Sequence, residues 1–83
     1  MLAQIKAILD SNGRLPVKAD TIGSSQDLYA AGLTSFSAVP VMLALEETFD
    51  VEFPEKMLNR RSFASIDAIA ACITELRPEA LAS

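Results

Sequence analysis

Apolar residues recur at intervals of three and four along three segments of the chain, and this spacing is typical of helices that bury one face. The first segment runs from residue 1 to about 10, the second from about 35 to 49 or 50, and the third from 65 to 77. A brief helix over 55–59 adds a fourth. The sequence therefore predicts an all-α fold, a small four-helix bundle of three long helices and one short helix.

A long polar stretch over residues 11–33 joins the first two helices, because Gly, Pro, Ser and Asn interrupt the helical spacing there. Asp27 is expected to cap a short helical turn that ends at Gly32. The main apolar anchors of this first loop are Leu28, Tyr29 and Leu33. A connection this long in a compact domain is usually functional or fixed by its own side chains, so we expect these anchors to fasten it.

The second helix carries two opposite apolar faces when its residues are placed at about 100° intervals. One face gathers Ala38, Val41, Met42, Leu45 and Phe49. The opposite face gathers Phe36, Val39 and Leu43, together with Pro40 and Glu47. In a small bundle only one face enters the core, so we expect the second to be an exposed patch that contacts a partner. A central helix packed on both sides is the alternative. Pro40 is expected to leave the start of this helix kinked or loosely formed.

The segment after the second helix carries a change of pattern. In the brief helix over 55–59 we expect Met57 and Leu58 to turn inward. Arg60 and Arg61 then break the helical spacing. We expect these two side chains to be solvated or paired with acidic neighbours, and a contact with a partner or a phosphate is the alternative.

Composition excludes several classes of function. The formal net charge is −4 at pH 7 and Lys and Arg are not clustered, so nucleic-acid binding is not expected. The chain has no His and one Cys, which excludes a Cys/His zinc site, a His-based triad and an intramolecular disulfide. The sequence also lacks a bilayer-spanning run and the features of a secretory signal. We expect a cytoplasmic monomer with one domain, residues 1–77, and a tail, residues 78–83.

Ser35 stands where the first loop is predicted to meet the second helix, just after Gly32 and Leu33. The N-terminus of a helix favours phosphate because its free N–H groups and positive dipole end stabilise negative charge. This position therefore suits covalent phosphate chemistry on the Ser35 hydroxyl. An ordinary capping serine is the alternative interpretation, and Thr34 could provide the cap as well.

Two stretches of the chain resemble the acyl carrier protein family. Asp-Leu at 27–28 and Gly-Leu-Thr-Ser-Phe at 32–36 resemble its D-L…G-x-D-S-L attachment motif. Met-Leu-Ala-Leu-Glu-Glu-Thr-Phe-Asp-Val-Glu-Phe-Pro at 42–54 resembles its M-A-L-E-E-x-F-x-x-x-I-P stretch. Together with the helix pattern, the similarity covers roughly residues 1–77, and the expected fold is the bundle of acyl-carrier-protein type with a long first loop.

The resemblance implies a carrier protein rather than an enzyme. Ser35 would accept 4′-phosphopantetheine from coenzyme A through a phosphopantetheinyl transferase, and acyl or aminoacyl groups would be held on the arm as thioesters. An acyl- or aminoacyl-activating ligase and downstream acyl-transfer enzymes would be the other partners. The residues expected to contact partners are Thr34, Phe36, Val39, Pro40, Leu43 and Glu47.

The chain departs from the family pattern near Ser35. Thr34 replaces the acidic residue that usually precedes the modified serine, and Ser37 and Pro40 stand where acidic residues often line the docking helix. This reduced charge suggests a specialised pathway rather than bulk fatty-acid synthesis, with the aminoacyl carrier branch as one possibility. An unmodified helical interaction module is the alternative function. A serine hydrolase, the third candidate, is disfavoured by the lack of His and of a G-x-S-x-G elbow.

Overall fold

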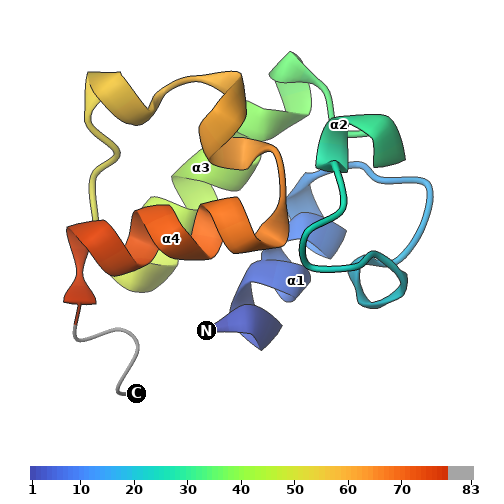
Figure 1. Ribbon diagram of the computed structural model, residues 1–83, viewed down its shortest axis with the longest axis horizontal. Coiled ribbons are helices and arrows are strands. Elements are labelled where there is room, and N and C mark those ends of the chain that lie inside the picture. The colour runs from blue at the N-terminus through green and yellow to red at the C-terminus, as the bar shows by residue number, and fades with distance from the viewer. Residues whose placement is uncertain (79–83) are drawn as a thin grey trace.

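The computed structural model describes residues 1–78 and contains four α-helices. These are α1 (Leu2–Asn12), α2 (Leu28–Ala31), α3 (Ser35–Phe49) and α4 (Ile66–Leu76). Three short 3₁₀ turns lie at Ala19–Thr21, Glu55–Met57 and Arg60–Phe63. Figure 1 shows α4 in front of α3, with α2 at the end where α3 begins. The described residues form no strand, and the predicted all-α fold is confirmed.

Three long helices build the core, and α1 packs against both α3 and α4. The largest fully buried side chains are Ile5, Leu9, Leu28, Val41, Leu45, Ile66, Ile69 and Ile73. They come from all four helices and belong to one hydrophobic cluster. The face of α3 predicted to enter the core does so, since Ala38, Val41, Leu45 and Phe49 are buried there and Met42 is partly buried. None of the helices in residues 1–78 has the length and apolar character needed to cross a membrane.

The first loop is fastened to the helices at several points. Leu28 and Leu33 are buried as predicted, and Ile22 is a further buried anchor that the sequence pattern did not single out. The Asp10 carboxylate accepts the backbone N–H of Ala19 at 2.8 Å. Two backbone bonds join the loop to the start of α4: Leu28 N–H donates to the Ala64 carbonyl at 2.7 Å, and Asp67 N–H donates to the Ser24 carbonyl at 2.9 Å.

The short helix α2 begins and ends at the predicted residues. The Asp27 carboxylate accepts the backbone N–H of Tyr29 at 2.9 Å and caps the helix. Gly32 ends it with φ of +125°, a conformation that side-chain-bearing residues rarely adopt. A Cβ at this position would lie 2.6 Å from Cδ of Pro16. Glycine is therefore required here, and the turn that it makes delivers the chain to the start of α3.

The connection between α3 and α4 differs from the prediction. The expected helix over 55–59 is a 3₁₀ turn that ends at Met57, which is buried as predicted. The inward orientation predicted for Leu58 is wrong, because the residue follows the end of the turn and its side chain is 50% exposed. A second 3₁₀ turn follows where a break was predicted. The Asn59 side chain caps this turn by accepting the N–H of Ser62 at 3.0 Å.

Side chains also hold the C-terminal end of α3. Asp50 ends the helix in the left-handed conformation with φ of 55°. Arg77 Nη1 donates to the Phe49 carbonyl at 2.7 Å and lies 3.5 Å from the Asp50 carboxylate. The Glu46 carboxylate accepts the N–H of Phe53 at 2.8 Å. The domain boundary at residue 77 stays a prediction, because most of the proposed tail, residues 79–83, lies outside the described residues.

Truncation of a side chain is expected to lower the stability of the protein on the buried face of α3 and to have little effect on the exposed face. Leu45→Ala removes a fully buried side chain and is expected to lower the free energy of unfolding by about 2–5 kcal/mol. Leu43→Ala, two residues earlier on the exposed face, is the matched control and is expected to stay within about 0.5 kcal/mol of the unmodified chain. Urea unfolding followed by circular dichroism measures both. An equal loss of stability in the two variants would contradict this assignment of the faces.

Candidate functional site

Ser35 is the first residue of α3, and its side chain is exposed. The capping residue is Thr34: its Oγ1 accepts the N–H of Ser37 at 3.1 Å, and Oγ of Ser37 accepts the N–H of Thr34 at 3.0 Å. This reciprocal pair is a capping box. The Ser35 hydroxyl makes no hydrogen bond to any residue that the structure describes. It therefore has no part in holding the helix and is free to react.

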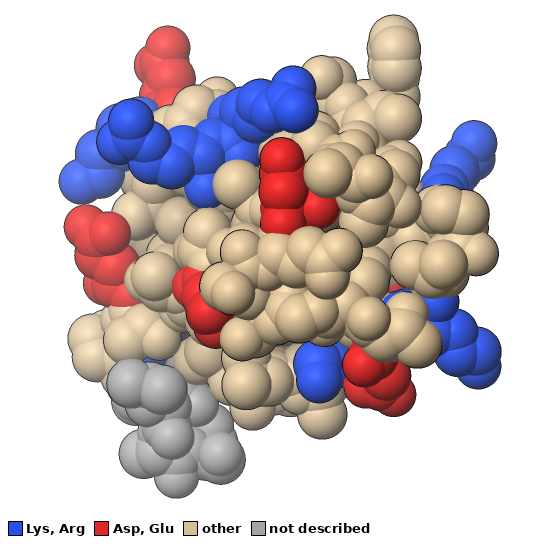
Figure 2. Space-filling view, turned by 45° about the vertical axis from the view of Figure 1, so that its right-hand side comes forward, with Lys and Arg blue, Asp and Glu red and all other residues tan. Residues whose placement is uncertain are grey.

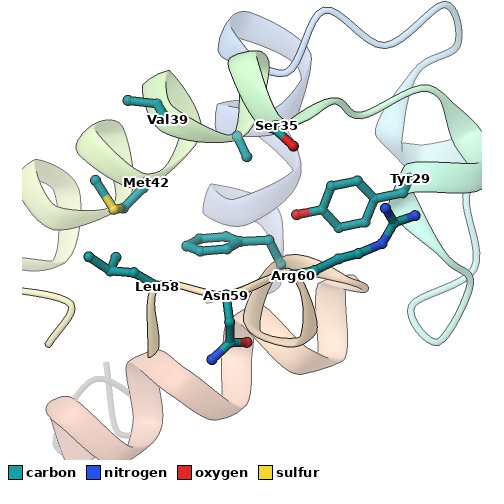
Figure 3. A pocket seen from close by; sticks show the side chains of 9 residues that line it. Tyr29, Ser35, Val39, Met42, Leu58, Asn59 and Arg60 are labelled. Carbon is teal, nitrogen blue, oxygen red and sulfur yellow. The ribbon is translucent and has the colours of Figure 1, made fainter. Parts of the chain in front are cut away.

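A groove of about 300 Å³ opens beside Ser35 between α2, α3 and the connection to α4. It is lined by Tyr29, Ser35, Ala38, Val39, Met42, Leu58, Asn59, Arg60 and Phe63. Figure 3 shows the Ser35 hydroxyl and the Tyr29 hydroxyl at this groove, with the side chains of Leu58 and Arg60 on its other side and the Asn59 amide directed away from it. The lining is mainly apolar, contains no acidic residue and includes one cation. Ser35 is thus placed at the edge of a cavity with a few polar groups.

Arg60 is held against Tyr29 by a cation–π contact. The guanidinium carbon lies 4.2 Å from the centre of the Tyr29 ring (Figure 3). Arg60 is exposed, as predicted, and no acidic neighbour among the described residues pairs with it. Its contact with Tyr29 was not predicted and arises because the fold brings the 3₁₀ turn over α2. Burial raises the pKa of Tyr29 above its ordinary value of 10.0, Arg60 opposes this rise, and Asp27 adds to it. The phenol therefore stays protonated and neutral near pH 7.

The outer face of α3 carries an apolar patch, here called the α3 patch, formed by Phe36, Val39 and Leu43. Their side chains are 90%, 52% and 55% exposed, respectively. The prediction of an exposed face is confirmed, and the alternative of a helix packed on both sides is wrong. Leu58 lies across the groove from Val39 and extends the exposed apolar surface (Figure 3). Exposed apolar side chains that adjoin one another mark a contact surface for another molecule.

The other predicted contact residues surround this patch. Thr34, Pro40 and Glu47 are all exposed. Despite Pro40, α3 is continuous from Ser35 to Phe49 and its first turn is closed by the capping box, so the loosely formed start that we predicted is not observed. A second hollow of about 280 Å³ lies on this side of the helix and is lined by Arg14, Gly32, Thr34, Phe36, Ser37 and Pro40.

Several residues near Ser35 were not linked to it by the sequence. Arg14, Asn59 and Phe63 line the two hollows, although they lie far from Ser35 along the chain. No short-range pattern connects such residues, and only the folding of the first loop and of the segment after α3 brings them to the site.

Figure 2 shows basic side chains gathered along the upper part of one face, beside a broad uncharged surface.

The comparisons with known proteins agree on a carrier. A family model described as "Phosphopantetheine attachment site" matches residues 4–73. A protein of Agrobacterium fabrum strain C58, described as "Aminoacyl carrier protein", is 58% identical over 69 residues, which cover 83% of each of the two chains.

Two solved structures have the same fold. One is a complex of an engineered Bradyrhizobium japonicum glycine:[carrier protein] ligase with a carrier protein from Agrobacterium tumefaciens and AMP. The matching chain is 54% identical with a TM-score of 0.87, and the match covers 89% of the present chain and 99% of that chain. The other is a solution structure from Agrobacterium tumefaciens, 49% identical over the whole of both chains with a TM-score of 0.75.

The present chain therefore belongs to the phosphopantetheine-dependent carrier proteins of the acyl carrier protein family. The resemblance found in the sequence is confirmed, and the similarity extends to a member of the aminoacyl carrier branch. Members of this family act as carriers and have no catalytic site of their own, and their cofactor is covalently attached 4′-phosphopantetheine. Family membership favours the carrier over the unmodified interaction module.

Because Thr34 and not Ser35 caps α3, substitution of Thr34 is expected to lower the free energy of unfolding more than substitution of Ser35. Thr34→Ala is expected to lower the free energy of unfolding by about 1 kcal/mol, because it leaves an N–H group of the first turn without its acceptor. Thr34→Ser keeps the hydroxyl and is expected to retain most of the stability. Ser35→Ala is expected to change it by less than about 0.5 kcal/mol. Denaturant unfolding of the three variants checks this, and a large loss in Ser35→Ala would show that Ser35 has a structural role.

Proposed function

We propose that Ser35 is the attachment point of the 4′-phosphopantetheine arm and that the chain carries aminoacyl groups. The observation that carries the proposal is the Ser35 hydroxyl: it is exposed, makes no hydrogen bond within residues 1–78 and lies at the first position of a 15-residue helix. It also lies within the span that matches the attachment-site family. The neighbouring hydroxyls of Thr34 and Ser37 are engaged in the capping box and do not share this freedom.

Attachment of the arm requires one displacement at phosphorus. The Ser35 oxygen bonds to the pantetheine-bearing phosphorus of coenzyme A, the bond from that phosphorus to the oxygen of adenosine 3′,5′-bisphosphate breaks, and the bisphosphate leaves. The hydroxyl proton is expected to pass to a base of the transferase, because the chain has no His, no carboxylate lines the groove beside Ser35 and Tyr29 stays protonated. Ser35 therefore contributes an accessible oxygen, and the N-terminus of α3 stabilises the charge of the phosphodiester.

The residues around Ser35 fit such an arm. Pantetheine combines apolar carbon groups with two amides and a hydroxyl, and the groove presents apolar walls from Val39, Met42 and Phe63. The Tyr29 hydroxyl can exchange hydrogen bonds with amide groups along it, whereas the Asn59 amide is engaged with Lys56 and Ser62. When attached, the arm supplies a terminal thiol that holds a carboxylic acid as a thioester.

An amino acid is the cargo that the relatives support. The 58% identical relative is described as an aminoacyl carrier, and similar chains occur in complexes with a glycine:[carrier protein] ligase and AMP or ATP. We infer that a ligase of this class activates an amino acid with ATP, with release of pyrophosphate, and transfers it to the thiol of the arm, with release of AMP. Downstream acyl-transfer enzymes would then receive it, in a specialised pathway of the cytoplasm.

The α3 patch, with Thr34, Pro40 and Glu47 at its edges, is the proposed docking surface for the transferase, the ligase and the acyl-transfer enzymes. Its apolar side chains can be desolvated on contact, and few charges surround them. Glu46 accepts the Phe53 N–H, and Asp50 lies at the C-terminal end of α3 beside Arg77, at the opposite end of the helix from Ser35. Docking is therefore dominated by apolar contact, and a monomeric carrier leaves this face open to each partner in turn.

The attachment site is tested by intact mass. With coenzyme A and a broad-specificity phosphopantetheinyl transferase, the unmodified chain is expected to gain the mass of one phosphopantetheine group, and Ser35→Ala is expected to gain none. Ser25→Ala removes an exposed serine of the first loop and is the matched control, expected to gain the full mass. Modification of the Ser35→Ala chain would place the arm on another residue.

The docking surface is tested with Phe36→Ala in the holo protein. Because Phe36 is exposed, its truncation is expected to leave the fold intact and to raise the KM for loading by a glycine:[carrier protein] ligase about tenfold or more. Leu2→Ala, which truncates an exposed leucine on α1, is the control and is expected to leave the KM unchanged. Loading of both variants at the rate of the unmodified carrier would exclude the α3 patch as the ligase contact.

A further inference from the structure

We propose that the groove beside Ser35 accepts neutral groups at the end of the arm and excludes a positively charged aminoacyl group, so that aminoacyl cargo stays in solvent. This inference rests on the proposed function, since it assumes an arm on Ser35. The observation behind it is that the groove is mainly apolar and that its lining contains one cation, Arg60, which is stacked on Tyr29.

The position of Arg60 is determined by its surroundings. Its guanidinium lies over the Tyr29 ring at 4.2 Å, and the 3₁₀ turn that carries it is capped by Asn59. The Arg60 side chain is exposed and borders the groove near Ser35 (Figure 3). None of the nine lining residues is acidic. The nearby Asp27 carboxylate caps α2 through the N–H of Tyr29 and is not part of the lining. The groove therefore offers positive charge and no carboxylate.

An aminoacyl group carries an α-amino group, and such groups have pKa values of about 7.7–8.0, so a large share is protonated at neutral pH. Entry of an ammonium group into the groove would remove its hydration shell and return no anionic partner. It would also bring two positive charges close together where Met42, Val39 and Phe63 lower the local polarity. A neutral acyl group of the same size meets neither cost and gains apolar contact.

The consequence is a carrier that displays its cargo. An aminoacyl group kept out of the groove remains beside the exposed α3 patch, where a docked acyl-transfer enzyme can reach it without first opening the bundle. The same exclusion leaves the thioester open to water, which favours prompt transfer over storage. The charge of Arg60 thus makes the groove accept a neutral acyl group and exclude an aminoacyl group carried on the same arm.

The test compares two cargoes of equal size on the ¹⁵N-labelled holo protein. Glycyl and propionyl groups have the same number of heavy atoms but differ by the ammonium charge, and each is held through an amide in place of the thioester to prevent hydrolysis. The backbone amide signals of Met42 and Phe63 report on the groove. The propionyl group is expected to shift these two signals from their positions in the holo protein without cargo. The shift caused by the glycyl group is expected to be at least about threefold smaller.

Arg60→Gln removes the cation. In this variant the displacement of the Met42 and Phe63 signals by glycyl is expected to approach the displacement by propionyl. Arg61→Gln makes the same change at an exposed neighbour that does not line the groove, and it is expected to retain the full difference. Equal displacement by both cargoes in the unmodified carrier, or no displacement by either, would overturn the exclusion. A difference that persists in Arg60→Gln would overturn the role of Arg60. Failure of the proposed function is distinguishable, since it appears earlier as the absence of a mass gain on Ser35.

Discussion

The burial of one face of α3 against the other helices is the constraint on which the structure depends. Val41 and Leu45 are fully buried in the same cluster as Leu9 and Ile69, and this packing fixes the rotation of α3 about its axis. The opposite face must then be exposed, whatever its hydrophobicity. The core therefore determines where the α3 patch lies and, with it, the side of the molecule from which a partner can approach Ser35.

The position of Ser35 at the start of α3 is determined by its neighbours in the sequence rather than by the core. Gly32 makes a turn that a residue with a side chain could not make beside Pro16, and Thr34 and Ser37 close the first turn of the helix. Because these two residues satisfy each other's backbone N–H groups, the Ser35 hydroxyl is not needed for the cap and bonds to none of the described residues. A carrier needs no more chemistry than this, since its partners supply the bases and its arm supplies the sulfur.

Apart from the loosely formed start expected for α3, the errors of the sequence-based prediction lie in the segment that joins α3 to α4. The helical spacing over 55–59 was too short to distinguish an α-helix from a 3₁₀ turn, and Leu58 was consequently placed inside. Arg60 is exposed as expected, but nothing nearby in the sequence indicated its contact with Tyr29, 31 positions earlier. Both residues line the groove, so the part of the site that was missed is the part built from distant segments.

The sequence by itself determined the three long helices, the two faces of α3, the capped turn from Asp27 to Gly32 and the candidacy of Ser35. These features follow from local spacing and capping chemistry, which act over a few residues and can be recognised in the chain. Only the tertiary structure decided which of two possible residues caps α3, which exposed leucine borders the groove and which aromatic ring holds Arg60. Those outcomes depend on how segments far apart in the sequence pack together, and no local pattern encodes that packing.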